Sequence, residues 1–386
     1  YRCINTDAST VSDDGLTVEL KYDYTFGPGI HKLNIYVMDK SFVESLGAEP
    51  DWYDPANLVG SGPYKVTDYT KDYGVTFELR DDYWGSGDFD ADKINVYQYT
   101  DQTTMMIDVE SGKLDIAVGT SEIDTSVAMD GGIDKVVGDV IKSNSVVLLN
   151  LSDESPKLQD KAVREAICLS VNTEEMTAAS YGVLGITATS PYATGLLGYE
   201  DGHTYEYNPE KARQILADAG YKDGDIELFF LSANTTELYA IAETLQSYLS
   251  EIGINLTVES GSIATVNGII REDPLASDFI INRQMDGIPD GEPWFSIYVY
   301  GDNYVFPQSA RQNDPELQEY LDVLEFSLDE DARIQASKAV QAYLIDNYIC
   351  IPICEFGTGI AYRSDTVSAP NIISDTMTNL RYVKLV

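Results

Sequence analysis

The stretch "NLVGSGPYKVTDYTKDYGVTFELRDDYWG", which runs from Asn57 to Gly85, combines a Gly-Ser-Gly-Pro turn, alternating apolar and polar residues and a Tyr-Trp-Gly. Its glycines lie close to Lys65, so a phosphate-binding loop has to be considered. A P-loop requires GxxxxGK followed by Ser or Thr at the start of a helix, whereas Pro63 leads directly into the strand-like "YKVTDY". We therefore interpret Gly60, Gly62 and Pro63 as turn residues that set up a β-hairpin, and the stretch as scaffold.

The length and composition of the chain predict a large folded protein with more than one lobe. A chain of 386 residues exceeds the size of a single ordinary core. Hydrophobic residues make up 44% and aromatic residues 11%, which is unlike a disordered composition. Two lobes are therefore expected.

The charge balance excludes one class of partner. The chain carries 25 Lys and Arg against 64 Asp and Glu, a formal net charge of -39, which repels phosphate backbones and anionic membranes. We expect no nucleic-acid binding. The acidity mildly favours neutral ligands or ligands with an amine, although solubility is the simpler explanation and net charge does not report on a particular pocket.

Cysteine and histidine usage predicts neither a disulfide framework nor a metal site. The four cysteines show no regular spacing, so buried free thiols are expected, and the two histidines stand apart from other metal-ligating side chains. GxSxG is absent, and acidic pairs are common in so acidic a chain, so no catalytic residues and no cofactor are predicted. The residues concerned are Cys3, Cys168, Cys350, Cys354, His31 and His203.

Apolar periodicity changes along the chain and indicates mixed α/β structure. The first 150 residues are mainly strand-like, and alternating helices and strands follow. The predicted strands are Gly15–Tyr24, Lys32–Met38, Gly62–Tyr69, Gly74–Arg80, Lys93–Tyr99, Leu114–Gly119 and Val146–Ser152. The predicted helices are Gln102–Gly112, Asp160–Asn172, Asn208–Gly220, Thr236–Gly253, Asp314–Leu328 and Asp329–Asn347. Strands return near residue 350, so the chain is expected to cross between the lobes twice, at hinge strands near Val146–Leu151 and Glu355–Tyr362.

The most unusual stretch is "DFIINRQMDGIPDGEPWFSIYVYGDN", residues Asp278 to Asn303, in which a strand-like "FII" leads into an irregular acidic loop. Loops after strands in α/β proteins are common ligand sites. A carboxylate of Asp286 or Asp290 could hold an ammonium group, and Trp294 could supply an apolar wall. A solvated acidic loop with Trp294 in a local core is an equally open interpretation.

Several separated stretches resemble one family. "NLVGSGPYKVTDY", "VTFELRDDYWG" and "DKINVYQYTDQTTMMIDVESGKLDIA" are similar to the GTGPY turn, YWG strand end and GE-x-D-I segment of the family 5 extracellular solute-binding proteins of ABC importers. Ser61 and Lys113 depart from that pattern. "LQDKAVREAICLSVNTEEM" and "YNPEKARQILADAGY" extend the resemblance, which runs from about Val11 to Leu385 in the family's order.

The resemblance implies an α/β, two-lobed, clam-shell fold of the periplasmic-binding-protein type, with a β-rich first lobe. The expected boundaries are residues 1–147 for lobe one, 148–356 for lobe two and 357–386 for the return to lobe one. In the family, an acidic residue after the strand at Phe279 holds the amino terminus of bound peptides. Asp286 and Asp290 are the nearest positions, with Arg283 and Trp294 as further ligand contacts.

The function implied by the resemblance is extracytoplasmic binding of di- or oligopeptides, or another small solute, and delivery to an ABC permease. We expect a monomer with no metal, held at the membrane by an N-terminal lipid that precedes this sequence, because the chain starts partway through the family's first lobe. The alternatives are an extracellular hydrolase of peptides or glycans and a sensing module without transport.

Overall fold

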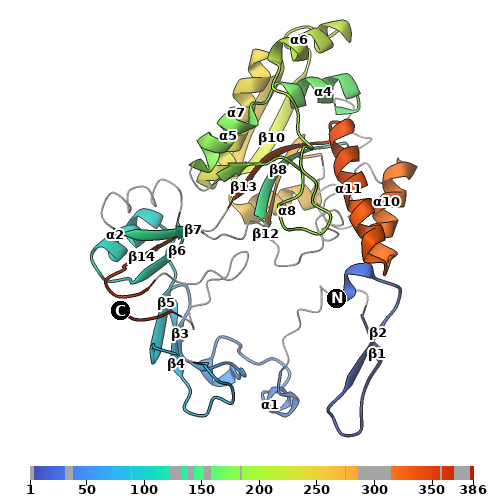
Figure 1. Ribbon diagram of the computed structural model, residues 1–386. Coiled ribbons are helices and arrows are strands. Elements are labelled where there is room, and N and C mark those ends of the chain that lie inside the picture. Colours follow the sequence, from blue (N-terminus) through green and yellow to red (C-terminus); the bar gives the residue numbers. More distant parts are fainter. Residues whose placement is uncertain are drawn as a thin grey trace. The chain divides into compact units, whose positions relative to one another are not determined.

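The computed structural model describes residues 4–30, 38–87, 89–120, 133–137, 143–151, 158–182, 185–273, 275–285, 314–356, 359–368 and 383–386 (Figure 1). The chain divides into two compact units. Unit 1 comprises residues 1–33 and 141–356, and unit 2 comprises residues 34–140 and 357–386. The chain thus passes between the units after residues 33, 140 and 356.

Unit 1 is built around a four-stranded sheet in the order β12-β8-β13-β9, with antiparallel neighbours throughout. Its strands are β8 (Ser143–Leu149), β9 (Gly185–Thr187), β12 (Phe279–Met285) and β13 (Cys350–Phe356). The helices that surround it are α4 (Lys161–Leu169), α5 (Thr173–Ser180), α6 (Pro209–Asp218), α7 (Thr236–Glu251), α8 (Ile263–Glu272), α10 (Pro315–Phe326) and α11 (Glu330–Asp346).

Alternate residues of β8 contribute to two different hydrophobic cores. Val147 and Leu149 pack with α4, α5, α6 and α7, whereas Val146 and Leu148 pack with α8, α10 and α11. Because successive side chains of a strand point to opposite faces, a strand that is apolar at every position requires cover on both faces. The run "VVLL" is therefore the centre of a three-layer unit (Figure 1).

A parallel pair, β10 (Glu227–Ala233) and β11 (Asn255–Gly261), is joined through α7 in a β-α-β connection. The predicted helix start at α6 is confirmed: the Asn208 side chain accepts a hydrogen bond from the amide of Lys211, and Pro209 is the first helical residue. The predicted stop is confirmed too, since Gly220 follows with φ of 91°, a left-handed conformation that favours glycine.

The first described residues form an antiparallel hairpin of β1 (Ile4–Val11) and β2 (Val18–Tyr22), followed by the 3-10 turn η1 (Gly27–Ile30). The turn lies against α10, and a Cβ added to Gly27 would lie 2.2 Å from the carbonyl oxygen of Ser327. This close approach explains why residues 1–33 group with unit 1.

Unit 2 contains two antiparallel three-stranded sheets, β3-β4-β5 and β6-β14-β7, among its described residues. The strands are β3 (Tyr64–Thr70), β4 (Gly74–Leu79), β5 (Lys93–Tyr97), β6 (Ile116–Thr120), β7 (Asp134–Val137) and β14 (Gly359–Tyr362). The helical segments are α1 (Lys40–Ser45), η2 (Pro55–Asn57) and α2 (Gln102–Glu110). The two predicted strands are confirmed as the hairpin β3–β4, but its turn is formed by residues 71–73, with Asp72 at φ of 59°, and the Gly-Ser-Gly-Pro segment precedes β3.

The units divide the chain at other residues than the predicted lobes, whose first boundary is at residue 147. Residues 1–33 and 141–147 lie in unit 1. Hydrogen bonding places residues 143–147 there, because β8 pairs along its whole length with β12. How the units correspond to functional lobes stays a prediction.

One predicted helix is divided into two in the structure, and one predicted strand falls mostly outside the described residues. The helix predicted for Asp160–Asn172 is shorter, because α4 ends at Leu169 and the Asn172 side chain caps a separate helix, α5, by accepting from the amide of Glu175. The strand predicted for Lys32–Met38 lies almost wholly outside the described residues. Within the described ranges, no helix combines the length and apolar character that crossing a membrane requires.

Candidate functional site

The candidate site lies at the end of the β12-β8-β13-β9 sheet where β12 and β13 end and β8 begins. This end of the strands is called the sheet edge below. Strand β12 ends at Met285, which is paired with Ser143 at the start of β8, and β13 ends at Phe356 on the other side of β8. The chain enters unit 1 shortly before β8 and leaves it directly after β13. Strand ends from which connecting segments leave are typical places for a ligand site in α/β proteins.

Of the four predicted site residues, the structure places one. Arg283 lies on β12 with its backbone opposite Ser145 of β8. Asp286, Asp290 and Trp294 lie outside the described residues, as does the side chain of Arg283. These three residues follow β12 in the sequence but are not described, so their assignment stays a prediction.

A buried carboxylate lies at the same edge. Glu355, the penultimate residue of β13, is 5% exposed, and its two carboxylate oxygens accept hydrogen bonds from the amide and the hydroxyl of Thr194, both at 2.9 Å. Burial raises the pKa of Glu355 above its ordinary value, and the two hydrogen bonds from Thr194 lower it by less. The ionised form of Glu355 is therefore destabilised by its loss of hydration.

Asn144 stands directly opposite Glu355 in the antiparallel pair of β8 and β13. Its side chain is fully buried, and Nδ2 donates a 2.7 Å hydrogen bond to the carbonyl of Pro191. This bond fixes the orientation of the amide, so that Oδ1 is the free end. Oδ1 has no hydrogen-bond donor among the described residues.

At the same strand ends, an aromatic stack covers the face of the sheet opposite to Asn144 and Glu355. The Tyr181 ring lies parallel to that of Phe356 with centroids 4.8 Å apart, and its hydroxyl shares a 2.7 Å hydrogen bond with the Ser145 hydroxyl. Ser145 is fully buried, so the bond satisfies a hydroxyl that would otherwise be desolvated without compensation. The stack anchors the last residue of β13 before the chain enters unit 2.

Residues 188–203, here called the strap, connect the sheet edge to α11. The strap begins where the amide of Ala188 donates to the carbonyl of Ile353 on β13, and it runs past Pro191 and Thr194. It has no regular secondary structure of its own, so side chains must satisfy much of its backbone.

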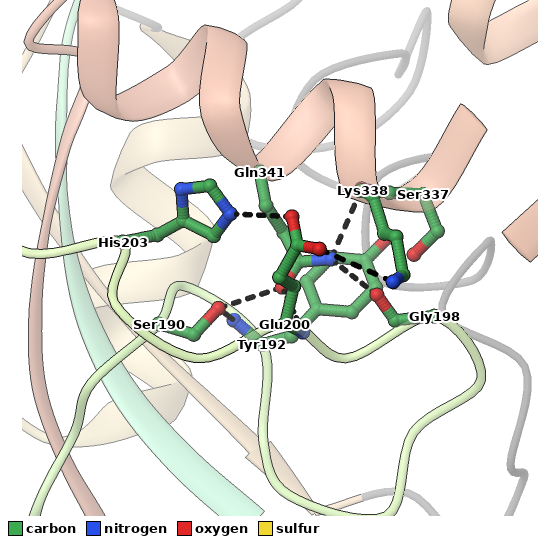
Figure 2. A network of polar contacts seen from close by, with 8 residues as sticks. All are labelled: Ser190, Tyr192, Gly198, Glu200, His203, Ser337, Lys338 and Gln341. Atoms are coloured by element: carbon green, nitrogen blue, oxygen red, sulfur yellow. Dashed lines mark hydrogen bonds and ion pairs between the residues drawn. The ribbon is translucent and has the colours of Figure 1, made fainter. Parts of the chain in front are cut away.

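Figure 2 shows how α11 holds the strap. The Gln341 side chain accepts from the hydroxyl of Ser190 at 2.6 Å and donates to the carbonyl of Gly198 at 2.7 Å. Closer to the surface, the Glu200 carboxylate contacts His203 Nε2 at 3.0 Å and Lys338 Nζ at 3.1 Å. These contacts with His203 and then Lys338 lower the pKa of Glu200.

Metal and thiol chemistry receive no support from the described residues. They contain no group of three or more metal-ligating side chains, and His203 is engaged with Glu200, while His31 lies outside them. Cys168, Cys350 and Cys354 are buried free thiols. Burial raises the pKa of Cys168 and Cys350, which makes the thiolate form unfavourable.

A separate hollow of about 330 Å³ lies in unit 2 between β5 and β6. Its lining is largely apolar, and it contains none of the predicted ligand contacts. The side chains that line it include Ile94, Val96, Ile116, Val118, Val383 and Leu385, with Lys113 among them.

The buried polar residues of the sheet edge were not predicted from the sequence. Asn144, Ser145 and Glu355 each interrupt or end an apolar strand, in "SNSVVLL" and "CIPICEF". A polar residue inside such a run is the signal that marks them, because burying it requires a partner. Their partners, Thr194 and Tyr181, are distant in sequence and follow only from the fold.

Both the sequence and the structure of the chain are similar to those of known proteins. The profile of the bacterial extracellular solute-binding proteins, family 5, matches residues 4–306. Heme-binding protein A of Haemophilus influenzae is 22% identical over 351 residues, which cover 89% of this chain and 63% of that protein. The dipeptide-binding protein of Escherichia coli is 22% identical over 230 residues, which cover 58% of this chain and 42% of that protein.

Among solved structures, the ABC transporter substrate-binding protein CtaP of Listeria monocytogenes superposes with a TM-score of 0.82 at 20% identity, covering 97% of this chain and 79% of that one. The likeness confirms the predicted α/β fold of the two-lobed periplasmic binding proteins. The chain spans 63% and 42% of the lengths of the two curated relatives named above.

Proposed function

Because the chain belongs to the bacterial extracellular solute-binding proteins of family 5, we propose that it is the binding component of an ABC importer. In this proposal it binds di- or oligopeptides between two lobes, outside the cytoplasm, and delivers them to a membrane permease. It acts as a monomer anchored by an N-terminal lipid. The family match over residues 4–306 is the observation that carries the proposal.

Peptides are the proposed solute for a chemical reason as well as by similarity. A relative of this chain is a dipeptide-binding protein, and the predicted site supplies carboxylates for an ammonium group. Extended peptides can be bound through their main chain, which gives affinity without strict sequence preference. Another relative is named for heme, so the solute itself has to be measured.

The proposed ligand contacts are Arg283, Asp286, Asp290 and Trp294. The position of Arg283 at the sheet edge supports this assignment, because the sequence segment with the other three residues begins at Asp286, directly after β12. In the proposed complex, Asp286 or Asp290 meets the peptide ammonium, Arg283 meets a carboxylate, and Trp294 forms an apolar wall.

Native mass spectrometry of the purified protein, mixed with a defined pool of di- to hexapeptides, tests the function. We expect intact peptides to be retained as one-to-one complexes. Shortened peptides in the pool would indicate a hydrolase and contradict the proposal. A bound mass of heme, visible also by its absorbance, would replace peptide as the solute.

The site is tested with the double variant Asp286→Asn, Asp290→Asn by calorimetry on a retained peptide. We expect a loss of about 2–5 kcal/mol of binding free energy, because the ammonium would be buried without a counter-charge. The control is the double variant Asp13→Asn, Asp81→Asn. It removes two exposed carboxylates and therefore changes the net charge by the same amount as the first variant. Unchanged affinity in the first variant would refute the assignment. An N-acetylated peptide should bind both proteins equally poorly.

A further inference from the structure

The pair of Asn144 and Glu355 occupies a special place in the chain. Asn144 lies four residues after the passage from unit 2 into unit 1, and Glu355 lies two residues before the passage back. The two are directly opposed across β8 and β13. Both bind the strap, at Pro191 and at Thr194. The same four-residue stretch of strap, Pro191 to Thr194, is therefore fixed to both connecting strands.

The charge of Glu355 is not balanced by a nearby cation in the described part of the chain. Among the described residues no charged group contributes to the shift of its pKa, whose causes are burial and the two hydrogen bonds from Thr194. The elements that contact β13 most closely are α5, α11, β8 and β9, and apolar side chains of α4 and α7 share its core. The two strands carry no charged residue, Tyr181 after α5 bonds Ser145, and Lys338 of α11 pairs with Glu200.

We propose that Glu355 is a proton-sensitive latch: its neutral form keeps the strap closed over the sheet edge, and its ionisation favours release of the strap at Thr194. Thr194 is exposed whereas Glu355 is buried, so movement of this one residue would admit water to the carboxylate. The state in which water reaches Glu355 is the state that its ionised form prefers.

Proton linkage gives the direction of the effect. In the closed arrangement the pKa of Glu355 is raised above 4.5, its ordinary value, whereas in a hydrated arrangement it returns towards that value. A proton therefore binds the closed arrangement more tightly and stabilises it. This stabilisation is complete below pH 4.5 and is lost as the pH rises through the raised pKa.

Asn144 supplies independent support for a neutral form. Its Oδ1 is a buried acceptor without a donor among the described residues. Directly opposed residues of an antiparallel pair have Cβ atoms about 4.5–5.5 Å apart, within reach of a side-chain hydrogen bond. A protonated Glu355 carries one O–H, which is the donor that this acceptor lacks.

The consequence for ligand binding rests on the proposed function. If the two strands form the hinge of a solute-binding protein, release of the strap frees the hinge. The ligand-bound state, in which the two lobes are closed around the solute, then becomes less populated as the pH rises. Glu355 acts here as a positioning residue, since its role does not require contact with the solute.

Amide hydrogen exchange of the ligand-free protein tests the latch directly. Protection of the peptides covering residues 190–194, corrected for intrinsic exchange, is followed from pH 4.5 upward to about pH 8. We expect it to fall in the wild-type protein, by up to about tenfold per pH unit between the ordinary and raised pKa. Glu355→Gln should show high, pH-independent protection. Glu200→Gln, which removes a carboxylate at the far end of the strap, should retain the wild-type dependence.

Equal pH dependence in wild type and Glu355→Gln, or wild-type protection that rises or stays constant with pH, would overturn the latch. A second measurement separates it from the proposed function. The ratio of peptide Kd between wild type and Glu355→Gln should increase with pH. A protein that binds no peptide but shows the exchange result would refute the proposed function and keep the latch. Peptide binding with a constant ratio would refute the coupling of the latch to the hinge.

Discussion

At the scale of single residues, the least expected feature is a set of buried polar groups on otherwise apolar strands. Asn144 and Glu355 are buried at the sheet edge, where apolar side chains would need no hydrogen-bond partners. Each has a strap group as partner instead, which ties an irregular segment to regular structure. A buried polar group without a partner costs about 1–3 kcal/mol, so such pairs specify one arrangement of the strap.

Gly27 provides a residue-scale prediction. A Cβ at this position would lie 2.2 Å from the Ser327 carbonyl oxygen, which is backbone and has little freedom to move. We expect Gly27→Ala to lower the free energy of unfolding by about 1–3 kcal/mol, measured by chemical denaturation. Gly268→Ala is the matched control: nothing lies within 4 Å of its added Cβ, and its position inside α8 predicts a gain of about 0.5–1 kcal/mol. Similar losses in both variants would contradict the close approach.

Glu200 gives a pH prediction of the opposite sign to that of Glu355. His203 and Lys338 lower its pKa, so its contribution to stability is present above the ordinary value of 4.5 and is lost as the pH falls below it. We expect Glu200→Gln to lower the midpoint of thermal unfolding slightly at neutral pH and to leave it unchanged in acid. A difference that grows towards acidic pH would contradict this assignment.

At the scale of elements, helix ends were the most predictable feature of unit 1. Asn208, Pro209 and Gly220 bound α6 as their residue types suggest, because capping is a local interaction between groups close in sequence. The break between α4 and α5 is local too, with Asn172 as the cap. The apolar periodicity of the sequence does not reveal this break, because α4 and α5 both pack apolar side chains into the same core.

The cap of α6 can be tested by substitution. We expect Asn208→Ala to cost about 1 kcal/mol of unfolding free energy, since the amide of Lys211 loses its acceptor. Asn208→Ser retains a capping oxygen and should cost much less. The comparison is made by urea denaturation at neutral pH. Equal costs for Ala and Ser would show that the cap does not contribute.

At the scale of the whole molecule, charge and connectivity dominate. A net charge of -39 opposes the compact state through repulsion among carboxylates. We expect added sodium chloride to raise the midpoint of thermal unfolding, because repulsion between exposed charges is screened. For a chain of this length, a gain of 1 kcal/mol would correspond to about 1 °C. A midpoint that falls or stays constant between low and moderate salt would show that repulsion is not a significant cost.

The division into units depends on long-range pairing. The entry into unit 1 at residue 141 has no signal in the local sequence pattern, because β8 belongs to unit 1 through hydrogen bonds with β12 and β13, which lie more than a hundred residues away in sequence.

By itself, the sequence determined the fold class, the family, most helices and strands, and the absence of a P-loop in the stretch Asn57–Gly85. These features depend on local patterns, namely periodicity, turn residues and caps. Only the tertiary structure decided that Asn144, Glu355 and Thr194 meet at one sheet edge and that the strap joins this edge to α11. Long-range pairing has no local signal, because register and burial depend on which distant segments share a sheet.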